Sequence, residues 1–271
     1  MSDLEPICSL NPFIEMVDKI KKYLEKIERE KNVKILLACE TGSRAWGFPS
    51  PDSDFDIRLI YAHHKDWYLS LSEKKDNIDL MFENNEIDIT GWDLRKSLRL
   101  MQKSNPSIIE RIQSPTLYKY DAAFLKDINA LAKKHYSKIA TMHHYLSMAK
   151  KFFFELKDQD TYKLKKFFYT LRAATASKWI LEKEELPPIE FAKMLAPLGL
   201  DNSLLDRINA LIALKATVSE SYLHQGEKEL FQFIETAIAK ADSVWKSLPS
   251  AKGNAEELDA FFIKMLNEND N

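Results

Sequence analysis

Two aspartates that lie two residues apart, shortly after a glycine-serine pair, are the residues of this sequence best suited to carry chemistry. Asp54 and Asp56 follow Gly42 and Ser43 after a short stretch that contains a second glycine, Gly47. On a strand, residues i and i+2 point to the same face. Two carboxylates placed in this way repel each other unless a cation lies between them. The spacing therefore predicts a divalent-metal pair at Asp54 and Asp56.

The composition narrows the metal and its co-ligand. The only cysteines, Cys8 and Cys39, are too few for a thiolate zinc site. Carboxylate oxygens favour Mg²⁺ or Mn²⁺, and Mg²⁺ is commonly held by one or two carboxylates together with substrate phosphates. A glycine-serine turn that leaves a strand supplies backbone N–H groups and a hydroxyl to such phosphates. We therefore expect Gly42 and Ser43 to bind phosphate.

A two-metal site that activates an attacking hydroxyl needs a further oxygen ligand beside the nucleophile. In the sequence Glu86-Ile87-Asp88-Ile89, the two isoleucines are expected to face the core, which leaves Asp88 on the opposite face. Asp88 is the predicted third carboxylate, and Asp79 is the second choice.

A predicted helix in the second half of the chain offers groups that suit a nucleotide. Lys165, Tyr169 and Arg172 are spaced i, i+4 and i+7 and therefore share one face. Arginine binds phosphate through a bidentate fork, and tyrosine stacks on a base or ribose. The alternative is a solvated basic stripe beside a packed tyrosine.

Two kinds of element must position these residues. After Asn11-Pro12, apolar residues recur every three or four positions as far as Ile27 and predict an amphipathic helix. Apolar or alternating runs predict strands at 34–39, 55–61, 78–82 and 86–92. Helical periodicity predicts helices near 121–135, 139–157, 161–183, 201–216 and 226–247. The polar tail from Ser250 is expected to fray.

The fold class that follows is α+β. We expect a small mixed β-sheet domain with flanking helices over residues 1–120, and an all-helical domain over residues 121–271 that completes a nucleotide cleft. With 45% hydrophobic residues, the chain has enough apolar material for a core, which excludes intrinsic disorder as its main state. No apolar run is long enough to span a membrane, and the first residues lack a signal peptide's pattern. A soluble, cytoplasmic protein is therefore expected.

The charge is distributed unevenly along the chain. The net charge is −2, but residues 40–93 hold 5 Lys or Arg against 12 Asp or Glu, whereas residues 94–172 hold 17 against 6. Carboxylates that hold cations would thus be followed by a segment that attracts phosphates. The alternative is that a helical segment carries solvated lysines.

Three stretches of the sequence carry a family resemblance. They are GSRAWGFPSPDSDFDIR, EIDITGWDLRKSLRLMQKSNPSIIERIQSPTLY and LKKFFYTLRAATASKWI. They resemble the bacterial RNA repair pathway DNA polymerase beta family, predicted nucleotidyltransferases of the DNA polymerase beta superfamily, over roughly residues 33–195.

The resemblance implies roles for individual residues. Gly42 and Ser43, with Arg44 beside them, match the nucleotide-binding turn. Asp54 and Asp56 match the metal pair and Asp88 the third carboxylate, for two Mg²⁺ or Mn²⁺ ions.

The predicted reaction is transfer of a nucleoside monophosphate from a nucleoside triphosphate to an acceptor hydroxyl, with release of pyrophosphate. The acceptor is an RNA end, a protein side chain or a small molecule. The rival hypothesis is a non-catalytic nucleotide or RNA sensor, or an antitoxin-like interaction module of the same fold. Retention of all three carboxylates favours the enzyme, because a binding module has no need of a costly anionic cluster.

Overall fold

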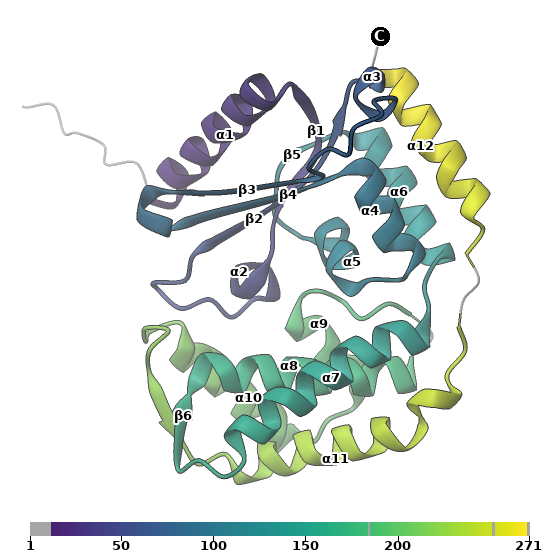
Figure 1. Ribbon diagram of the computed structural model, residues 1–271. Coiled ribbons are helices and arrows are strands. Elements are labelled where there is room, and N and C mark those ends of the chain that lie inside the picture. Colours follow the sequence, from purple (N-terminus) through teal and green to yellow (C-terminus); the bar gives the residue numbers. More distant parts are fainter. Residues whose placement is uncertain (1–11, 184, 251–252, 270–271) are drawn as a thin grey trace, which may run out of the picture.

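The computed structural model describes residues 12–183, 185–250 and 253–269 (Figure 1). It has a mixed sheet flanked by helices and then a run of helices, so the α+β prediction is confirmed. Asn11, before the predicted first helix, and Cys8 lie outside the described residues.

One mixed sheet of five strands, in the order β3-β4-β2-β1-β5, forms the centre of the first half. Its strands are β1 (Val33–Glu40), β2 (Phe55–His63), β3 (Asn77–Phe82), β4 (Ile87–Asp93) and β5 (Leu117–Tyr120). Strands β2 and β4 are parallel, and the other neighbouring pairs are antiparallel. The four predicted strands are present, and β5 is an additional strand that the sequence analysis did not predict.

Helices cover both faces of this sheet. They are α1 (Pro12–Lys31), α4 (Leu94–Gln102), α5 (Pro106–Gln113), α6 (Ala122–Lys134) and α12 (Ala255–Asn269). On one face, Ile57 and Leu59 of β2 pack in the cluster that contains Leu24 of α1. On the other face, Ile60 and Ala62 pack in the cluster that α4, α5, α6 and α12 share. We call the sheet and these helices the sheet lobe.

Short helices and turns connect the strands. They are α2 (Gly42–Trp46) between β1 and β2, α3 (Lys65–Tyr68) after β2, and the 3-10 turn η1 (Glu83–Asn85) in the hairpin between β3 and β4. Side chains cap the starts of α4 and α5, because Asp93 accepts from the backbone N–H of Arg95 and Asn105 accepts from that of Ser107.

The second half, which we call the helical lobe, packs its helices around one long buried helix, α8 (Figure 1). Its elements are α7 (Lys138–Leu156), β6 (Thr161–Lys163), α8 (Leu164–Glu182), α9 (Phe191–Leu195), η2 (Ala196–Leu198), α10 (Asn202–Lys215), β7 (Leu223–Gln225), α11 (Lys228–Val244) and η3 (Trp245–Ser247). The five long helices predicted from periodicity are present, with ends within a few residues of the predicted ones. The sequence analysis did not predict the two-stranded ribbon of β6 and β7.

The expectation that the tail frays is wrong. Residues 255–269 form α12, and Leu258, Phe261 and Met265 are buried in the cluster shared with α4 and α6. The ring of Phe261 stacks on Phe124 at a centroid distance of 5.9 Å. Three apolar residues at this helical spacing suffice because the sheet lobe offers an apolar surface for them.

The helices α6 and α12 belong to the sheet lobe by their apolar contacts, although they follow residue 120 in the sequence. The predicted division of the chain between residues 120 and 121 stays a prediction. In the part of the chain that the structure describes, no helix is both long and apolar enough to cross a membrane.

Candidate active site

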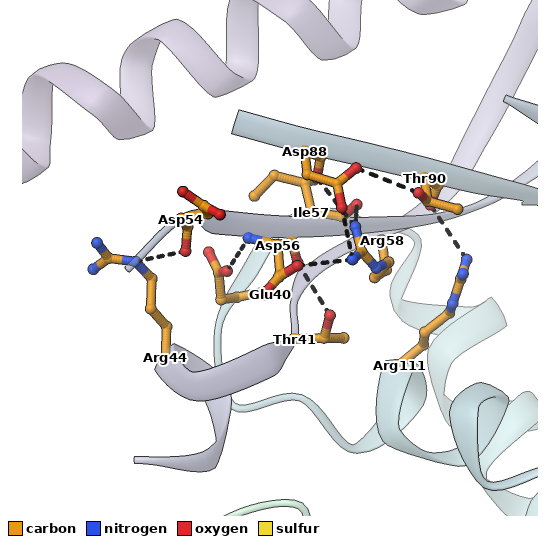
Figure 2. Close-up of polar contacts among 10 residues, drawn as sticks. All are labelled: Glu40, Thr41, Arg44, Asp54, Asp56, Ile57, Arg58, Asp88, Thr90 and Arg111. Carbon is orange, nitrogen blue, oxygen red and sulfur yellow. Dashed lines mark hydrogen bonds and ion pairs between the residues drawn. The ribbon is translucent and has the colours of Figure 1, made fainter. Parts of the chain in front are cut away.

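The predicted carboxylates lie where β2 and β4 begin, on the sheet face that α4, α5 and α6 cover further along. Asp56 and Arg58 alternate with the buried residues Ile57 and Leu59, so they point to this face. The parallel register places Asp56 directly opposite Asp88, and Figure 2 shows their side chains converging. Asp54 stands just ahead of the strand and is exposed.

The backbone of Asp56 is fixed from the end of β1. Its N–H donates to Glu40 Oε1 at 2.7 Å, and its carbonyl oxygen accepts from the N–H of Thr41 at 2.8 Å. The other carboxylate oxygen of Glu40 accepts from Tyr118 Oη at 2.5 Å. Burial raises the pKa of Glu40 to about 7. A buried carboxylate and its tyrosine partner therefore hold the strand residue that carries the predicted metal ligand.

A glycine is required at position 42. Its φ is +64°, a left-handed conformation that favours glycine, and a Cβ built there would lie 2.0 Å from Asp56 Oδ2. The carboxylate of Asp56 thus lies directly against the backbone of the glycine-serine turn.

A cation of the protein lies between two of the three carboxylates (Figure 2). Arg58 Nη2 donates to Asp56 Oδ1 at 2.8 Å and to Asp88 Oδ2 at 2.9 Å. Its Nη1 donates to the carbonyl oxygens of Ile57 and Asp88, each at 3.1 Å. The Arg58 side chain is 19% exposed, so its charge is only partly screened by solvent.

Burial also acts on the aspartates themselves. It raises the pKa of Asp56, an effect that Arg58 opposes and that Asp88 and Asp54 strengthen. It also raises the pKa of Asp54, with Glu220 of the helical lobe adding repulsion. The neighbouring negative charges thus add to the cost of ionising both aspartates.

The donor set fits a divalent cation, although it is not gathered as a closed cage. Among the described residues, no three His, Cys, Asp or Glu side chains are already arranged around one metal position. The available donors are the carboxylate oxygens of Asp54, Asp56 and Asp88, a set that suits Mg²⁺ or Mn²⁺ with substrate phosphates as further ligands. Two ions remain a prediction.

The other two residues of the turn have their side chains engaged in the fold. Ser43 is buried, and its Oγ donates to Ser53 Oγ at 3.1 Å. Arg44 donates to the carbonyl oxygens of Ser53 and Asp54 at 2.7 and 3.1 Å and lies over the Phe55 ring. Both side chains hold the loop that leads into β2, and their contact with a nucleotide stays a prediction.

A cleft of about 380 Å³ opens beside Asp56 and Arg58, between the two lobes. Tyr169 of α8 forms part of its wall, edge-on to Trp46 at a centroid distance of 5.0 Å. The lining residues are Thr41, Gly42, Trp46, Asp56, Arg58, Thr90, Trp92, Ser107, Glu110, Arg111 and Tyr169. Tyr169 therefore lines the same cleft as Asp56, and its role in binding a base or ribose stays a prediction.

Lys165 and Arg172, which were predicted on the same helix face, have different surroundings in the structure. Lys165 forms an ion pair with Glu220 and contributes an opposing charge near Asp54 and Asp56. Arg172 is buried, and its Nη2 donates to Glu110 Oε1 at 2.9 Å and to the carbonyl oxygen of Ile189 at 3.1 Å. Lys165 is thus near the carboxylates, whereas Arg172 connects the two lobes.

The two candidates for the third carboxylate differ in their neighbours. Asp88 is the register partner of Asp56, whereas Asp79 on β3 is paired with Thr90 and contacts Asn77 and Lys75. Asp88, and not Asp79, therefore lies opposite Asp56, and its role as the third carboxylate stays a prediction.

Sequence reasoning gave no role to Glu40 or Arg58. The signal for Arg58 was its i+2 spacing from Asp56, which places it on the same strand face. Glu40 was the one charged residue at the end of a buried strand, but its partner Tyr118 lies on β5, which was not predicted.

Comparisons with known proteins show which family the chain belongs to. The family model described as the RNA repair pathway DNA polymerase beta family, RlaP, matches residues 16–264. An uncharacterized protein of Bacillus subtilis (strain 168), YcgL, is 34% identical over 254 residues, which cover 93% of this chain and 97% of that protein.

A solved structure of a nucleotidyltransferase-like protein from Exiguobacterium sibiricum 255-15 aligns with 84% of this chain and 75% of its own. Its TM-score is 0.31 at 11% identity, a likeness too low to carry a conclusion. The family match and the relative each extend over nearly all of this chain, so the chain belongs to the RNA repair pathway DNA polymerase beta family.

Proposed function

We propose that this protein is a metal-dependent nucleotidyltransferase, which transfers a nucleoside monophosphate from a nucleoside triphosphate to an acceptor hydroxyl. The observation that supports this most directly is the pairing of Asp56 with Asp88 across β2 and β4, beside Gly42. A cluster of like charges at the edge of a cleft is costly to keep and is accounted for by a cationic cofactor with phosphates.

The proposed cofactor is a pair of Mg²⁺ or Mn²⁺ ions held by Asp54, Asp56 and Asp88. When bound, the ions would neutralise the charge that builds up on the α-phosphate and on the attacking oxygen.

The residues of the chain have separate tasks in this proposal. Gly42, which has no side chain, leaves room for the carboxylate of Asp56 against the turn. Tyr169 forms the wall beside the base or ribose, and Lys165 provides a positive charge near the phosphates. Asp88 has one oxygen, Oδ2, bound to Arg58, whereas Oδ1 lies 3.5 Å from the Thr90 hydroxyl, which leaves Oδ1 as the atom that receives the proton of the acceptor.

Two bonds change at the α-phosphorus in the proposed reaction. The acceptor oxygen forms a bond to the α-phosphorus while the bond between that phosphorus and the bridging oxygen breaks, and pyrophosphate leaves with the electron pair. The proton of the acceptor hydroxyl passes to Asp88 Oδ1.

An RNA end is the acceptor that we propose. The family description refers to RNA repair, and residues 94–172 carry the positive balance that attracts phosphates.

The test is pyrophosphate release with each labelled nucleoside triphosphate and Mg²⁺, with and without RNA. We expect release with RNA and loss of release in Asp54→Asn/Asp56→Asn, whose Mn²⁺ binding in calorimetry should also disappear while the fold is kept.

Asp88→Asn should retain nucleotide affinity within a few-fold but lose about 10²–10⁴ in single-turnover rate. Asp79→Asn is the matched variant on the neighbouring strand and should remain close to wild type. If the wild type binds nucleotide but releases no pyrophosphate with any acceptor, the protein is a sensor and the proposal is wrong.

A further inference from the structure

The guanidinium of Arg58 occupies the position between Asp56 and Asp88 that a cation shared by these two carboxylates would take. The two carboxylates face each other because their residues are register partners on parallel strands. Arg58 reaches both because it lies two residues after Asp56 on the same face. Four donor contacts, two to carboxylates and two to carbonyl oxygens, hold it in place.

The charge at the site follows from these contacts. Asp54, Asp56 and Asp88 contribute three negative charges, and Arg58 returns one positive charge, while nearby Lys165 is neutralised by Glu220. The remaining two negative charges attract a first divalent ion less strongly than the three carboxylates alone would. Two divalent ions would leave an excess of positive charge unless a triphosphate arrives with them.

We propose that Arg58 is a built-in counter-ion, a positioning residue that holds Asp56 and Asp88 together in the free protein and makes tight binding of divalent metal depend on the triphosphate. This inference rests on the proposed function. In this proposal, Arg58 sets the order of binding. The free protein binds metal weakly, and the phosphates bring the negative charge and the oxygen ligands that allow the ions to bind.

The physical basis is charge rather than shape. A unit charge a few ångströms from a divalent ion changes its binding by roughly tenfold even with the screening of bulk water, and by more in a partly buried site. Arg58→Gln should therefore bind Mn²⁺ roughly tenfold more tightly than wild type. Arg58→Lys, which keeps the charge without the planar fork, should stay close to wild type.

The experiment measures Mn²⁺ affinity by calorimetry and by the paramagnetic resonance of the free ion, first with Mn²⁺ alone and then with the preformed complex of Mn²⁺ and inorganic tripolyphosphate. Arg99→Gln is the matched control, because it removes the same charge from an exposed site on α4. In wild type, tripolyphosphate should tighten Mn²⁺ binding at least tenfold, and in Arg58→Gln this gain should shrink. In EDTA the Tm of Arg58→Gln should lie below that of wild type, and Mn²⁺ should raise it by more than it raises the wild-type Tm.

Several results would overturn the inference. Equal Mn²⁺ affinity in wild type and Arg58→Gln would remove the role of Arg58 but leave the proposed metal site intact. Arg58→Lys behaving like Arg58→Gln would show that the fork geometry matters and not the charge. If Arg58→Gln fails to fold, the wild-type measurement still decides, because tight Mn²⁺ binding without tripolyphosphate contradicts the inference. The absence of Mn²⁺ binding in every variant, with or without tripolyphosphate, would overturn the proposed function as well.

Discussion

At the scale of single residues, the cations predicted to bind nucleotide each have a partner within the protein. Arg44 holds two backbone carbonyl oxygens, Lys165 pairs with Glu220, and Arg172 pairs with Glu110. Of the three, Lys165 is the one whose charge acts on both Asp54 and Asp56. A triphosphate that reaches Lys165 must therefore compete with Glu220, whereas it reaches Arg172 only at the cost of the contact between the lobes.

His63 should make stability depend on pH. Burial lowers its pKa to about 4 from the ordinary 6.5, and its ring stacks on Trp67 at 3.9 Å. Because the folded-state pKa lies below the unfolded one, the neutral ring stabilises the fold fully above about pH 6.5, and this contribution is lost as the pH falls toward 4. Between pH 7 and pH 5, wild type should lose about 1–2 kcal/mol more than His63→Phe, which keeps the stack. Urea unfolding of both proteins at the two pH values measures this, and parallel losses would contradict it.

At the scale of elements, the loop that leads from α2 into β2 is held by the helical lobe. Ser53 Oγ accepts from Ser43 Oγ and from the N–H of Ser50, and donates to Glu220 Oε1 at 2.9 Å. The buried amine of Lys215 donates to Ser50 Oγ at 2.9 Å. The position of Asp54 therefore depends on contacts with α10 and the segment after it.

Ser53→Ala should release this loop. Loss of a shared, buried hydroxyl is expected to lower the free energy of unfolding by about 1–3 kcal/mol. Ser70→Ala, at an exposed serine, is the matched control and should change it by less than about 0.5 kcal/mol. Chemical denaturation gives both values, and amide hydrogen exchange should show faster exchange around Asp54 in Ser53→Ala alone. Unchanged exchange there would mean that Ser53 does not fix the loop.

The C-terminal helix α12 should contribute directly to the stability of the sheet lobe. Phe261 is 7% exposed and packs on Phe124, whereas Ile263, on the same helix, is 57% exposed. Phe261→Ala should cost about 3 kcal/mol of unfolding free energy, at the lower end of the range for buried phenylalanine. Ile263→Ala should stay within about 0.5 kcal/mol of wild type. Equal small losses in denaturant melts would indicate that α12 is not packed in solution.

At the scale of the whole molecule, a buried ion pair connects the lobes. Arg172 of α8 donates to Glu110 of α5, which also accepts from Tyr145 Oη at 2.9 Å and Trp46 Nε1 at 3.3 Å. The side chains of Arg172 and Glu110 are 4% and 16% exposed. Removing one partner of such a pair leaves an uncompensated charge in a poorly solvated site.

Glu110→Gln should therefore destabilise the protein by about 3 kcal/mol. The double variant Glu110→Gln/Arg172→Met should lose less than the sum of the two single variants, because it removes both charges together. The measurement is a double-mutant cycle from denaturant unfolding. Additive losses would show that the pair does not couple the lobes.

The sequence by itself determined the elements and the chemistry at the start of β2. Periodicities of two and of about 3.6 residues are local properties, so the four long strands and five long helices followed from the chain alone. The alternation along β2 also placed Asp56 and Arg58 on one face, because alternation along a strand needs no tertiary contact, whereas Asp54 lies just ahead of the strand.

Only the tertiary structure decided which distant residues meet. The choice of Asp88 over Asp79 as the partner of Asp56 depends on the parallel pairing of β2 with β4, and strand register is a long-range property. The helix face of Lys165 and Arg172 could be predicted, but not that Arg172 is buried against Glu110, because burial depends on what packs against a helix. The same reason explains α12, whose apolar residues Leu258, Phe261 and Met265 stabilise a helix because the sheet lobe provides the apolar surface that they cover.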